Sequence, residues 1–313
     1  MSTMAATPDM SIDFAGVPLR NPIIAASGTC GYVDELAGVL DPRAIGAIVT
    51  KSITREEREG NPPWRIVDVP HGMLNAIGLA NMGLDRFLAE KLPEAGKIDT
   101  VVIGSIAGHN VDDYLAVAEA FDDADALPLV ELNVSCPNVE DGLQFGEHPE
   151  KLRELLGAVR PVLSKTKMIV KLSPNVGDIV AMARAAIEEG ADALTLINTI
   201  TAMAIDVHSR QPRVSIGTGG LSGPGIHPVA VRMVHEVYDR VAREAGIPII
   251  GLGGVMTWRE AAEFILAGAS AVGMGTALFV NPRAPLKIAK GLAKWVAGQD
   301  CASVRELIGQ VQA

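Results

Sequence analysis

One stretch of the sequence gathers side chains suited to acid–base chemistry and to ligand recognition. The apolar run at 129–132 is typical of a short buried strand. It leads into Asn133-Val134-Ser135-Cys136-Pro137-Asn138, which supplies two amides, a hydroxyl and a thiol before the proline ends regular structure. This stretch is either an active-site loop or an ordinary turn with Cys136 as small apolar filler. The stretch by itself leaves both interpretations open.

Two lysines also stand at the ends of apolar runs. Lys51 and Lys171 each follow residues that are typical of a buried strand. A single lysine in such a place usually extends its ammonium group to solvent. Two lysines at one mouth favour a second interpretation, in which the ammonium groups lie near an anionic ligand or a developing negative charge.

Two glycine-rich turns are the remaining candidate ligand-binding segments. They are Gly251-Leu252-Gly253-Gly254 and Gly273-Met274-Gly275-Thr276. Glycines allow backbone N–H groups to approach a phosphate, although tight turns alone would also explain them. Neither run has the G-x-G-x-x-G spacing of a dinucleotide site. The paired turns therefore favour a phosphorylated cofactor or substrate.

The candidate residues follow predicted strands that alternate with helices. Apolar runs predict strands at 22–26, 47–50, 100–106, 129–133, 168–172, 193–197, 248–251 and 271–274. Helical spacing is found at 111–121, 149–163, 176–189 and 258–266. This alternation has no break in composition and predicts an α/β fold, a (β/α)8 TIM barrel that forms a single domain over 1–313. The candidate residues would then meet at the mouth formed by the carboxyl ends of the strands.

Four further segments complete the expected arrangement. We expect a loose leader at 1–11 and a small hairpin at 11–19 below the barrel. Long insertions at 54–84 and 200–223 follow the second and sixth strands. Loops of this length in a compact domain are usually lids or binding loops.

Composition excludes several classes of function. A net charge of -10 without a basic run argues against nucleic acid or an anionic membrane as a partner. The sequence shows neither a bilayer-spanning apolar run nor a signal peptide. Three scattered cysteines without a C-x-x-C pair indicate a cytoplasmic location and neither a disulfide framework nor a zinc site. The six histidines lack ligand spacing, so we predict no metal.

Several motifs together resemble the class 1 dihydroorotate dehydrogenases, and the resemblance extends over 12–311. They are Asn-Val-Ser-Cys-Pro-Asn at 133–138, Gly-Met-Leu-Asn-Ala-Ile-Gly-Leu at 72–79, and the segments 197–199, 219–224 and 268–272. The segment 72–79 is more similar to the NAD-linked 1B subclass than to the fumarate-linked one. The resemblance implies an FMN-containing barrel that oxidises dihydroorotate to orotate in pyrimidine biosynthesis.

The resemblance also implies roles for individual residues. Cys136 matches the catalytic base. Positions matching FMN contacts are Ser27, Lys51, Ser52, Asn133, Lys171, Ile197, Gly223, Gly253, Gly254, Gly275 and Thr276. Positions matching orotate contacts are Lys51, Asn75, Ala76, Ile77, Gly78, Leu79, Asn133, Asn138, Asn198 and Thr199. The chemistry is consistent, because flavin accepts a hydride and a thiol of pKa ~8.5 can be tuned to accept the proton.

The sequence departs from the family pattern at two places. Ser105 stands where the family usually has an asparagine that contacts FMN. Serine is shorter and has fewer donors, so we expect the direct contact to be lost or replaced by a water. The segment 140–145 lacks the glycine pair that is common in relatives.

Resemblance to the 1B subclass implies NAD as the final electron acceptor. The chain has no dinucleotide fingerprint, and its cysteines cannot provide the four thiolates of an iron–sulfur cluster. The resemblance therefore implies a partner subunit that carries FAD and a 2Fe-2S cluster and docks near the FMN. A homodimer of this chain would form the core of a heterotetramer.

Three alternatives to dihydroorotate oxidation are considered. The first is a flavin oxidoreductase acting on another pyrimidine, similar to dihydropyrimidine dehydrogenase. The second is a non-redox aldolase or isomerase that uses Lys171 as a Schiff base and the glycine turns for a substrate phosphate. The third is a non-catalytic barrel, against which Cys136 and the two lysines count.

Overall fold

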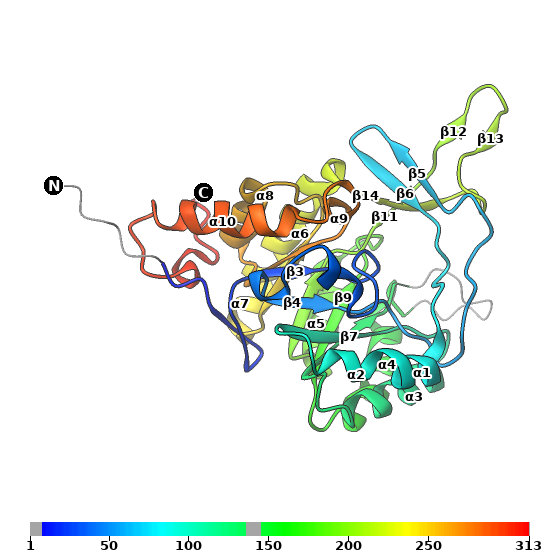
Figure 1. The fold of residues 1–313 in the computed structure, drawn as a ribbon, viewed down its shortest axis with the longest axis horizontal. Coiled ribbons are helices and arrows are strands. Elements are labelled where there is room, and N and C mark those ends of the chain that lie inside the picture. The colour runs from blue at the N-terminus through cyan, green and yellow to red at the C-terminus, as the bar shows by residue number, and fades with distance from the viewer. Residues whose placement is uncertain (1–7, 136–144, 313) are drawn as a thin grey trace.

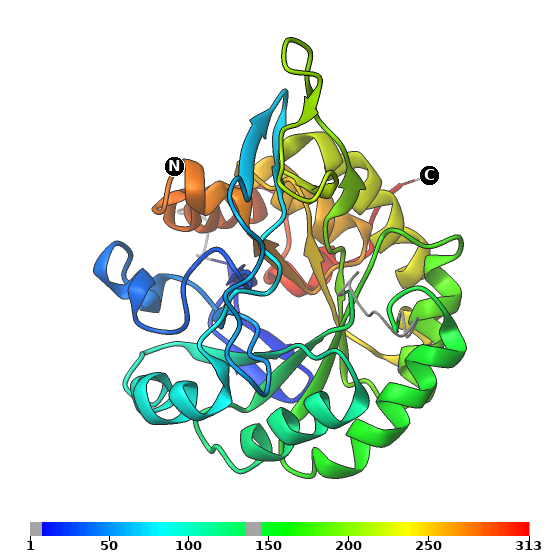
Figure 2. The same ribbon diagram turned by 90° about the vertical axis from the view of Figure 1, so that its right-hand side faces the viewer.

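Eight parallel strands close into a barrel surrounded by helices (Figure 2). The structure, a computed structural model, describes residues 8–135 and 145–312. The barrel strands are β3 (Ile23–Ala25), β4 (Ala47–Val49), β7 (Val101–Ile106), β8 (Leu129–Asn133), β9 (Lys167–Leu172), β10 (Ala193–Leu196), β15 (Ile249–Leu252) and β16 (Ala271–Met274). Each strand pairs with the barrel strand before it and the one after it in the chain, and β16 pairs with β3 to close the ring. The predicted strands and the TIM-barrel class are confirmed.

Helices of very different length follow the barrel strands. The longer ones are α3 (Val111–Asp122), α4 (Pro149–Val159), α5 (Ile179–Glu188), α6 (His227–Val237), α8 (Trp258–Ala267) and α10 (Ala284–Val296). The short ones are α1 (Gly83–Arg86), α2 (Leu92–Ala95), α7 (Arg243–Ala245) and α9 (Thr276–Val280). Helix α5 begins later than its apolar spacing predicts, because the Asp178 side chain caps the first turn by accepting from the N–H groups of Val180 and Ala181. Within the described ranges, none of the helices has the length and apolar character to cross a membrane.

The core between strands and helices depends on close approach at two strand glycines. A Cβ atom at Gly104 would lie 2.6 Å from Cδ2 of the buried Phe121 ring on α3. A Cβ atom at Gly251 would lie 2.6 Å from Cδ1 of the buried Phe264 ring on α8. The absence of a side chain on the strand therefore lets an aromatic ring on the covering helix lie directly against the barrel.

A hairpin of β1 (Ile12–Phe14) and β2 (Val17–Leu19) precedes the barrel, as the sequence predicts. The expected loose leader at 1–11 is wrong for its last residues, and 1–7 lie outside the described residues. Asp9 N–H donates to the Ala302 carbonyl at 2.9 Å, and its carboxylate pairs with Arg305 at 2.7 Å. The strand pairing and the ion pair attach this end of the chain to a segment near residue 303 that the sequence alone does not bring close.

The two long insertions form one sheet rather than two separate lids. Strands β5 (Ile66–Val69) and β6 (Gly72–Asn75) come from the first insertion, and β11 (Ile200–Ala202) and β14 (Gly219–Ser222) from the second. Strand β14 pairs with both β11 and β6, giving the order β11-β14-β6-β5. The sheet and the small hairpin of β12 (Ile205–Asp206) and β13 (Gln211–Pro212) extend away from the barrel (Figure 1).

Asp122 joins the end of α3 to the turn that starts β9. Its carboxylate accepts from the N–H groups of Lys165 and Thr166 at 2.9 and 2.8 Å, and from the Ser164 N–H and hydroxyl at 3.1 and 2.8 Å. Burial opposes ionisation of this carboxyl, but these hydrogen bonds outweigh it and lower the pKa well below the ordinary value of 3.8. The ionised carboxylate therefore stabilises the folded state at neutral pH.

We predict that Asp122→Asn lowers the free energy of unfolding by about 2 kcal/mol at neutral pH, because an amide cannot accept all these hydrogen bonds. The lowered pKa implies stability that is fully present above pH 3.8 and is lost as the pH falls through the folded-state pKa. Urea unfolding of both proteins should therefore show a difference that shrinks below pH 3.8. The control is Asp123→Asn, whose exposed carboxylate pairs with Lys165 and should matter little. A difference that does not change with pH would contradict this role.

Candidate active site

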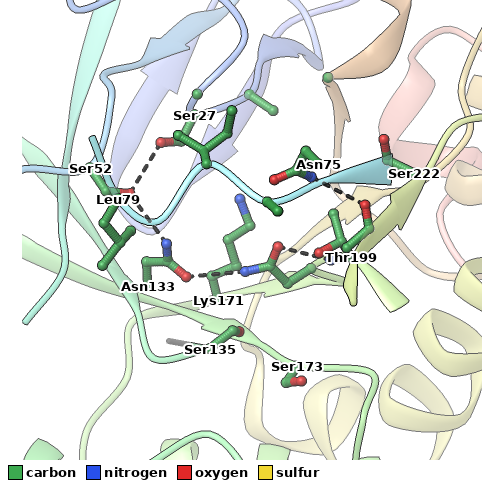
Figure 3. A pocket seen from close by; sticks show the side chains of 18 of the residues that line it. Ser27, Ser52, Asn75, Leu79, Asn133, Ser135, Lys171, Ser173, Thr199 and Ser222 are labelled. Carbon is green, nitrogen blue, oxygen red and sulfur yellow. Dashed lines mark hydrogen bonds between the residues drawn. The ribbon is translucent and has the colours of Figure 1, made fainter. Parts of the chain in front are cut away.

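A cavity of about 560 Å³ lies where the carboxyl ends of the barrel strands meet the sheet built by the insertions (Figure 3). This volume lies within the range of sites for small ligands and cofactors. Each described residue that matches an FMN or orotate contact of the family lines this cavity: Ser27, Lys51, Ser52, Asn75, Ala76, Ile77, Gly78, Leu79, Asn133, Lys171, Ile197, Asn198, Thr199, Gly223, Gly253, Gly254, Gly275 and Thr276. Cys136 and Asn138 lie outside the described residues, and Ser135, which precedes them, lines the cavity.

Asparagines from separate elements line the cavity, among them Asn75 and Asn133, which Figure 3 labels, and Asn198. Asn198 donates from Nδ2 to Oδ1 of Asn133 at 3.1 Å, and its own Oδ1 accepts from the Thr199 N–H at 2.8 Å. Asn75 donates to the Gly220 carbonyl at 3.2 Å, a bond between the two insertions. The cavity thus contains amides whose orientations are already constrained, an arrangement suited to a ring with its own donors and acceptors.

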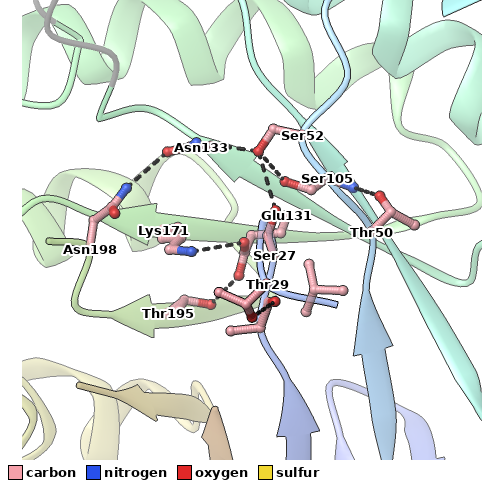
Figure 4. Close-up of polar contacts among 12 residues, drawn as sticks. Ser27, Thr29, Thr50, Ser52, Ser105, Glu131, Asn133, Lys171, Thr195 and Asn198 are labelled. Carbon is pink, nitrogen blue, oxygen red and sulfur yellow. Dashed lines mark hydrogen bonds and ion pairs between the residues drawn. The ribbon is translucent and has the colours of Figure 1, made fainter. Parts of the chain in front are cut away.

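A buried ion pair lies inside the barrel below these amides (Figure 4). The Lys171 ammonium is 3.5 Å from Oε1 of Glu131, whose Oε2 accepts from the Thr195 hydroxyl at 2.9 Å. The Glu131 and Lys171 side chains are 2% and 7% exposed. Sequence reasoning missed Glu131, although a single acidic residue within the apolar run at 129–132 was a visible signal.

Lys51 has no such counter-ion. No carboxylate of the described residues lies within 4.0 Å of its ammonium group, and it lines the cavity. Burial lowers its pKa below the ordinary value of 10.5, and the positive charge of Arg65 adds to the shift. Since burial disfavours the charged form of Lys51, binding of an anion would be the natural compensation.

The loop after β15 brings backbone close to the cavity. Gly253 and Gly254 have φ values of +144° and +72°, in the region that favours glycine. A Cβ atom at Gly254 would lie 2.8 Å from the Gly223 carbonyl oxygen. His227 donates from Nδ1 to the Gly253 carbonyl at 2.7 Å and packs edge-on against Phe264.

Asn175 and Arg58 line the cavity without having been predicted from the sequence, whereas the Ser135 hydroxyl belongs to the candidate stretch at 133–138. Asn175 donates to the Thr199 carbonyl at 3.1 Å and accepts from the Thr201 N–H at 2.8 Å, so it holds the start of β11. The buried Ser135 hydroxyl and the buried Nε of Arg58 line the cavity without a hydrogen-bond partner among the described residues. Orphaned polar groups of this kind are costly unless a ligand satisfies them. The only sequence signal for Asn175 and Arg58 is their position, after a predicted strand and within an insertion.

The two cysteines outside the stretch at 133–138 are poor candidates for a base. The Cys30 thiol donates to the Val49 carbonyl at 3.3 Å, and burial, followed by the nearby Glu35 charge, raises its pKa to about 12. Cys30 therefore stays protonated near neutral pH. Cys301 contacts the Val296 carbonyl at the end of α10 and does not line the cavity. Within the described part of the chain, no cluster of three or more His, Cys, Asp or Glu side chains could hold a metal ion.

Comparisons with known proteins agree with this arrangement. The sequence matches the dihydroorotate dehydrogenase family over residues 10–296. It is 48% identical to the catalytic subunit of dihydroorotate dehydrogenase B (NAD(+)) of Geotalea daltonii, over 98% of this chain and 99% of the relative. The protein of the same name from Bacteroides thetaiotaomicron is 44% identical over 97% of this chain and 99% of its own. Dihydroorotate dehydrogenase of Eimeria tenella, solved with ferulenol, is similar in fold, with a TM-score of 0.81 at 21% identity, covering 99% of this chain and 90% of that chain.

We predict that Glu131 and Lys171 depend on each other in stabilising the folded protein. Glu131→Gln or Lys171→Met alone should lower the free energy of unfolding by about 3 kcal/mol, because each leaves its partner uncompensated. The double variant should lose clearly less than the sum of the two, as urea unfolding would show. The control is the exposed pair of Lys151 and Glu154, where the same changes should each cost about 0.5 kcal/mol or less. Additive losses at Glu131 and Lys171 would contradict a mutual interaction.

Proposed function

The chain belongs to the dihydroorotate dehydrogenase family, and we propose that it is the FMN-binding catalytic subunit of an NAD-linked enzyme of that family. Its reaction would be the oxidation of (S)-dihydroorotate to orotate in the biosynthesis of UMP. The main support is geometric: every described residue that matches a ligand contact of the family lines the same cavity. We place the enzyme in the cytoplasm.

The side chains of the cavity fit a phosphorylated flavin. Gly253, Gly254 and Gly275, after β15 and β16, line the cavity, where backbone N–H groups could donate to a phosphate. Lys51 and Lys171 supply positive charge, which stabilises negative charge in a region of low dielectric. The unpaired Ser135 hydroxyl adds a further group for a polar ligand to satisfy. FMN, when bound, would supply the hydride acceptor.

The amides of Asn75, Asn133 and Asn198 fit a pyrimidine ring. Each amide offers donors and an acceptor, and the ring presents both kinds of group along its imide and carbonyl edges. Substrate oxidation removes a hydride from one ring carbon and a proton from its neighbour. The residues of the chain must therefore orient the ring and provide one base.

The pairing of Lys171 argues against the aldolase or isomerase alternative. A lysine that forms a Schiff base attacks as a neutral amine. The Lys171 Nζ is instead held in an ion pair with the buried Glu131 carboxylate at 3.5 Å. Lys171 is therefore better suited to stabilising charge than to nucleophilic attack.

Cys136 is proposed as the base that accepts the proton, on the resemblance and on the exclusion of Cys30. We predict that Cys136→Ala keeps bound FMN but slows flavin reduction by dihydroorotate about 10²–10⁴-fold, the usual effect of losing a base. Anaerobic stopped-flow absorbance of the flavin is the measurement. The wild-type rate should rise with pH as the thiolate forms, and the variant should lose this rise.

The matched control for this test is Cys301→Ala, which removes a thiol outside the cavity and should reduce its flavin at the wild-type rate. Wild-type reduction by Cys136→Ala would show that another group accepts the proton. Purified wild-type protein without bound flavin, or flavin that dihydroorotate does not reduce, would refute the proposed function itself.

We also propose that the electrons leave through a partner subunit that carries FAD and a 2Fe-2S cluster. The relatives that share 44–48% of their residues with this chain are named as catalytic subunits of an NAD(+) enzyme, which implies a second subunit. This chain would form a homodimer within a heterotetramer. A cavity lined by described residues lies at the barrel mouth, and the sequence has no dinucleotide fingerprint.

The isolated chain should therefore reduce an artificial dye with electrons from dihydroorotate but form almost no NADH. Absorbance assays of the purified chain with dihydroorotate and either acceptor would measure both rates. The dye reaction serves as the internal control, since it shows that the flavin site is active. Rapid NADH formation by this chain alone would refute the need for a partner.

A further inference from the structure

We propose that Ser105 is a positioning residue that holds the Ser52 hydroxyl as a hydrogen-bond donor into the cavity. This inference rests on the proposed function, because the acceptor would be an atom of bound FMN. Ser105 is 0% exposed on β7 and does not line the cavity, whereas Ser52 does. Ser105 can therefore influence a ligand only through other residues.

A backbone N–H fixes the direction of the hydrogen bonds at one end of the network. Figure 4 shows the side chains of this network, from Asn198 through Asn133 and Ser52 to Ser105. The Thr199 N–H can only donate, so the atom of the Asn198 amide that faces it must be the oxygen. Nδ2 of Asn198 then faces Asn133, which must present its own oxygen at 3.1 Å. The Nδ2 group of Asn133 consequently faces the Ser52 Oγ at 3.3 Å. Ser52 therefore accepts a hydrogen bond from Asn133. The hydrogen-bond network itself assigns the oxygen and the nitrogen of both amides.

Burial fixes the direction at the other end. The Ser105 Oγ lies 2.8 Å from the Ser52 Oγ, and this is its sole side-chain hydrogen bond among the described residues. If Ser52 donated to Ser105, the Ser105 hydrogen would be buried without an acceptor. Leaving a buried donor unpaired costs folding free energy, because the group loses its hydrogen bonds to water and gains none in the protein. Ser105 therefore donates to Ser52. The Ser105 N–H, which donates to the Thr50 hydroxyl at 2.9 Å, holds the backbone in place.

These two constraints leave one direction for the Ser52 hydrogen. The Ser52 oxygen accepts from Asn133 and from Ser105, so both of its lone pairs are occupied. Its hydrogen must point elsewhere, and the nearest described acceptor is the Ser27 Oγ at 3.4 Å. That distance is well beyond the usual 2.7–2.8 Å for two hydroxyls. Since Ser27 and Ser52 both line the cavity, the Ser52 hydrogen is available to a ligand there.

Ser105 would thus replace a direct contact by an indirect one. The family usually places an asparagine at this position, and asparagine would donate to the cofactor itself. In this chain the shorter serine orients a second serine, which donates in its place.

The test is a double-mutant cycle on FMN affinity, measured by fluorescence titration of the full-length protein after removal of its flavin. In the wild-type background Ser105→Ala should weaken FMN binding about fivefold, the typical effect of one neutral hydrogen bond. In the Ser52→Ala background the same change should have no further effect, because Ser105 acts only through Ser52. Ser303→Ala removes a buried hydroxyl that caps the turn at Val304–Leu307 outside the cavity, and should leave FMN affinity unchanged.

Each other result refutes a definite statement. An equal loss in both backgrounds would show that Ser105 acts through packing, and an unchanged affinity in the wild-type background would show that the orientation of Ser52 is unimportant. Either outcome overturns the proposal for Ser105. If Ser105→Ala does not fold, Ser105→Cys, which keeps the volume and weakens the donor, takes its place in the same cycle. Failure of the wild-type protein to bind FMN would instead refute the proposed function.

Discussion

The closure of eight parallel strands into a ring is the constraint on which the site depends. Parallel pairing turns every carboxyl end toward the same mouth, so the residues that follow the strands must share one small space. Asn133, Lys171 and Asn198 come from consecutive strands or their ends and line one cavity for this reason. Polar groups brought together in this way must be paired with one another or with a ligand, because leaving them buried and unpaired is costly.

The two lysines show both solutions to this requirement. Lys171 finds a carboxylate within the barrel, at Glu131, and Thr195 satisfies the second oxygen of that carboxylate. Lys51 lies at the same mouth without a carboxylate from the described residues, and burial lowers its pKa. The charge of Lys171 is therefore paired within the protein, whereas the charge of Lys51 could be paired by an anionic ligand. This division supports a site for a ligand that carries negative charge.

The sheet of strands β11, β14, β6 and β5, which borders the cavity, adds a second constraint that joins distant parts of the chain. Strand β14 of the second insertion pairs with β6 of the first, placing Gly220 opposite Asn75. The amide of Asn75 donates to the Gly220 carbonyl, so the same contact that builds the sheet also orients a residue proposed to bind substrate. Residues of this sheet and residues of the barrel line the same cavity, so a substrate bound there would contact both.

Much of the fold was predictable from the sequence because its signals are local. Apolar runs predicted the barrel strands, and the residues at their carboxyl ends predicted the content of the mouth, since a closed parallel barrel leaves no other place for them. The role of Cys136 was implied by resemblance and is still a prediction, because that residue lies outside the described residues. The pairing of β6 with β14, the attachment of Asp9 beside Ser303, and the partner of Glu131 appeared only in the tertiary structure. Each joins residues distant in the chain through hydrogen bonds or charge, and neither periodicity nor composition records which distant group will satisfy a given donor or acceptor. The direction of the Ser105–Ser52 hydrogen bond is of the same kind, because it follows from a backbone N–H at Thr199 and from burial, not from the identity of the serines.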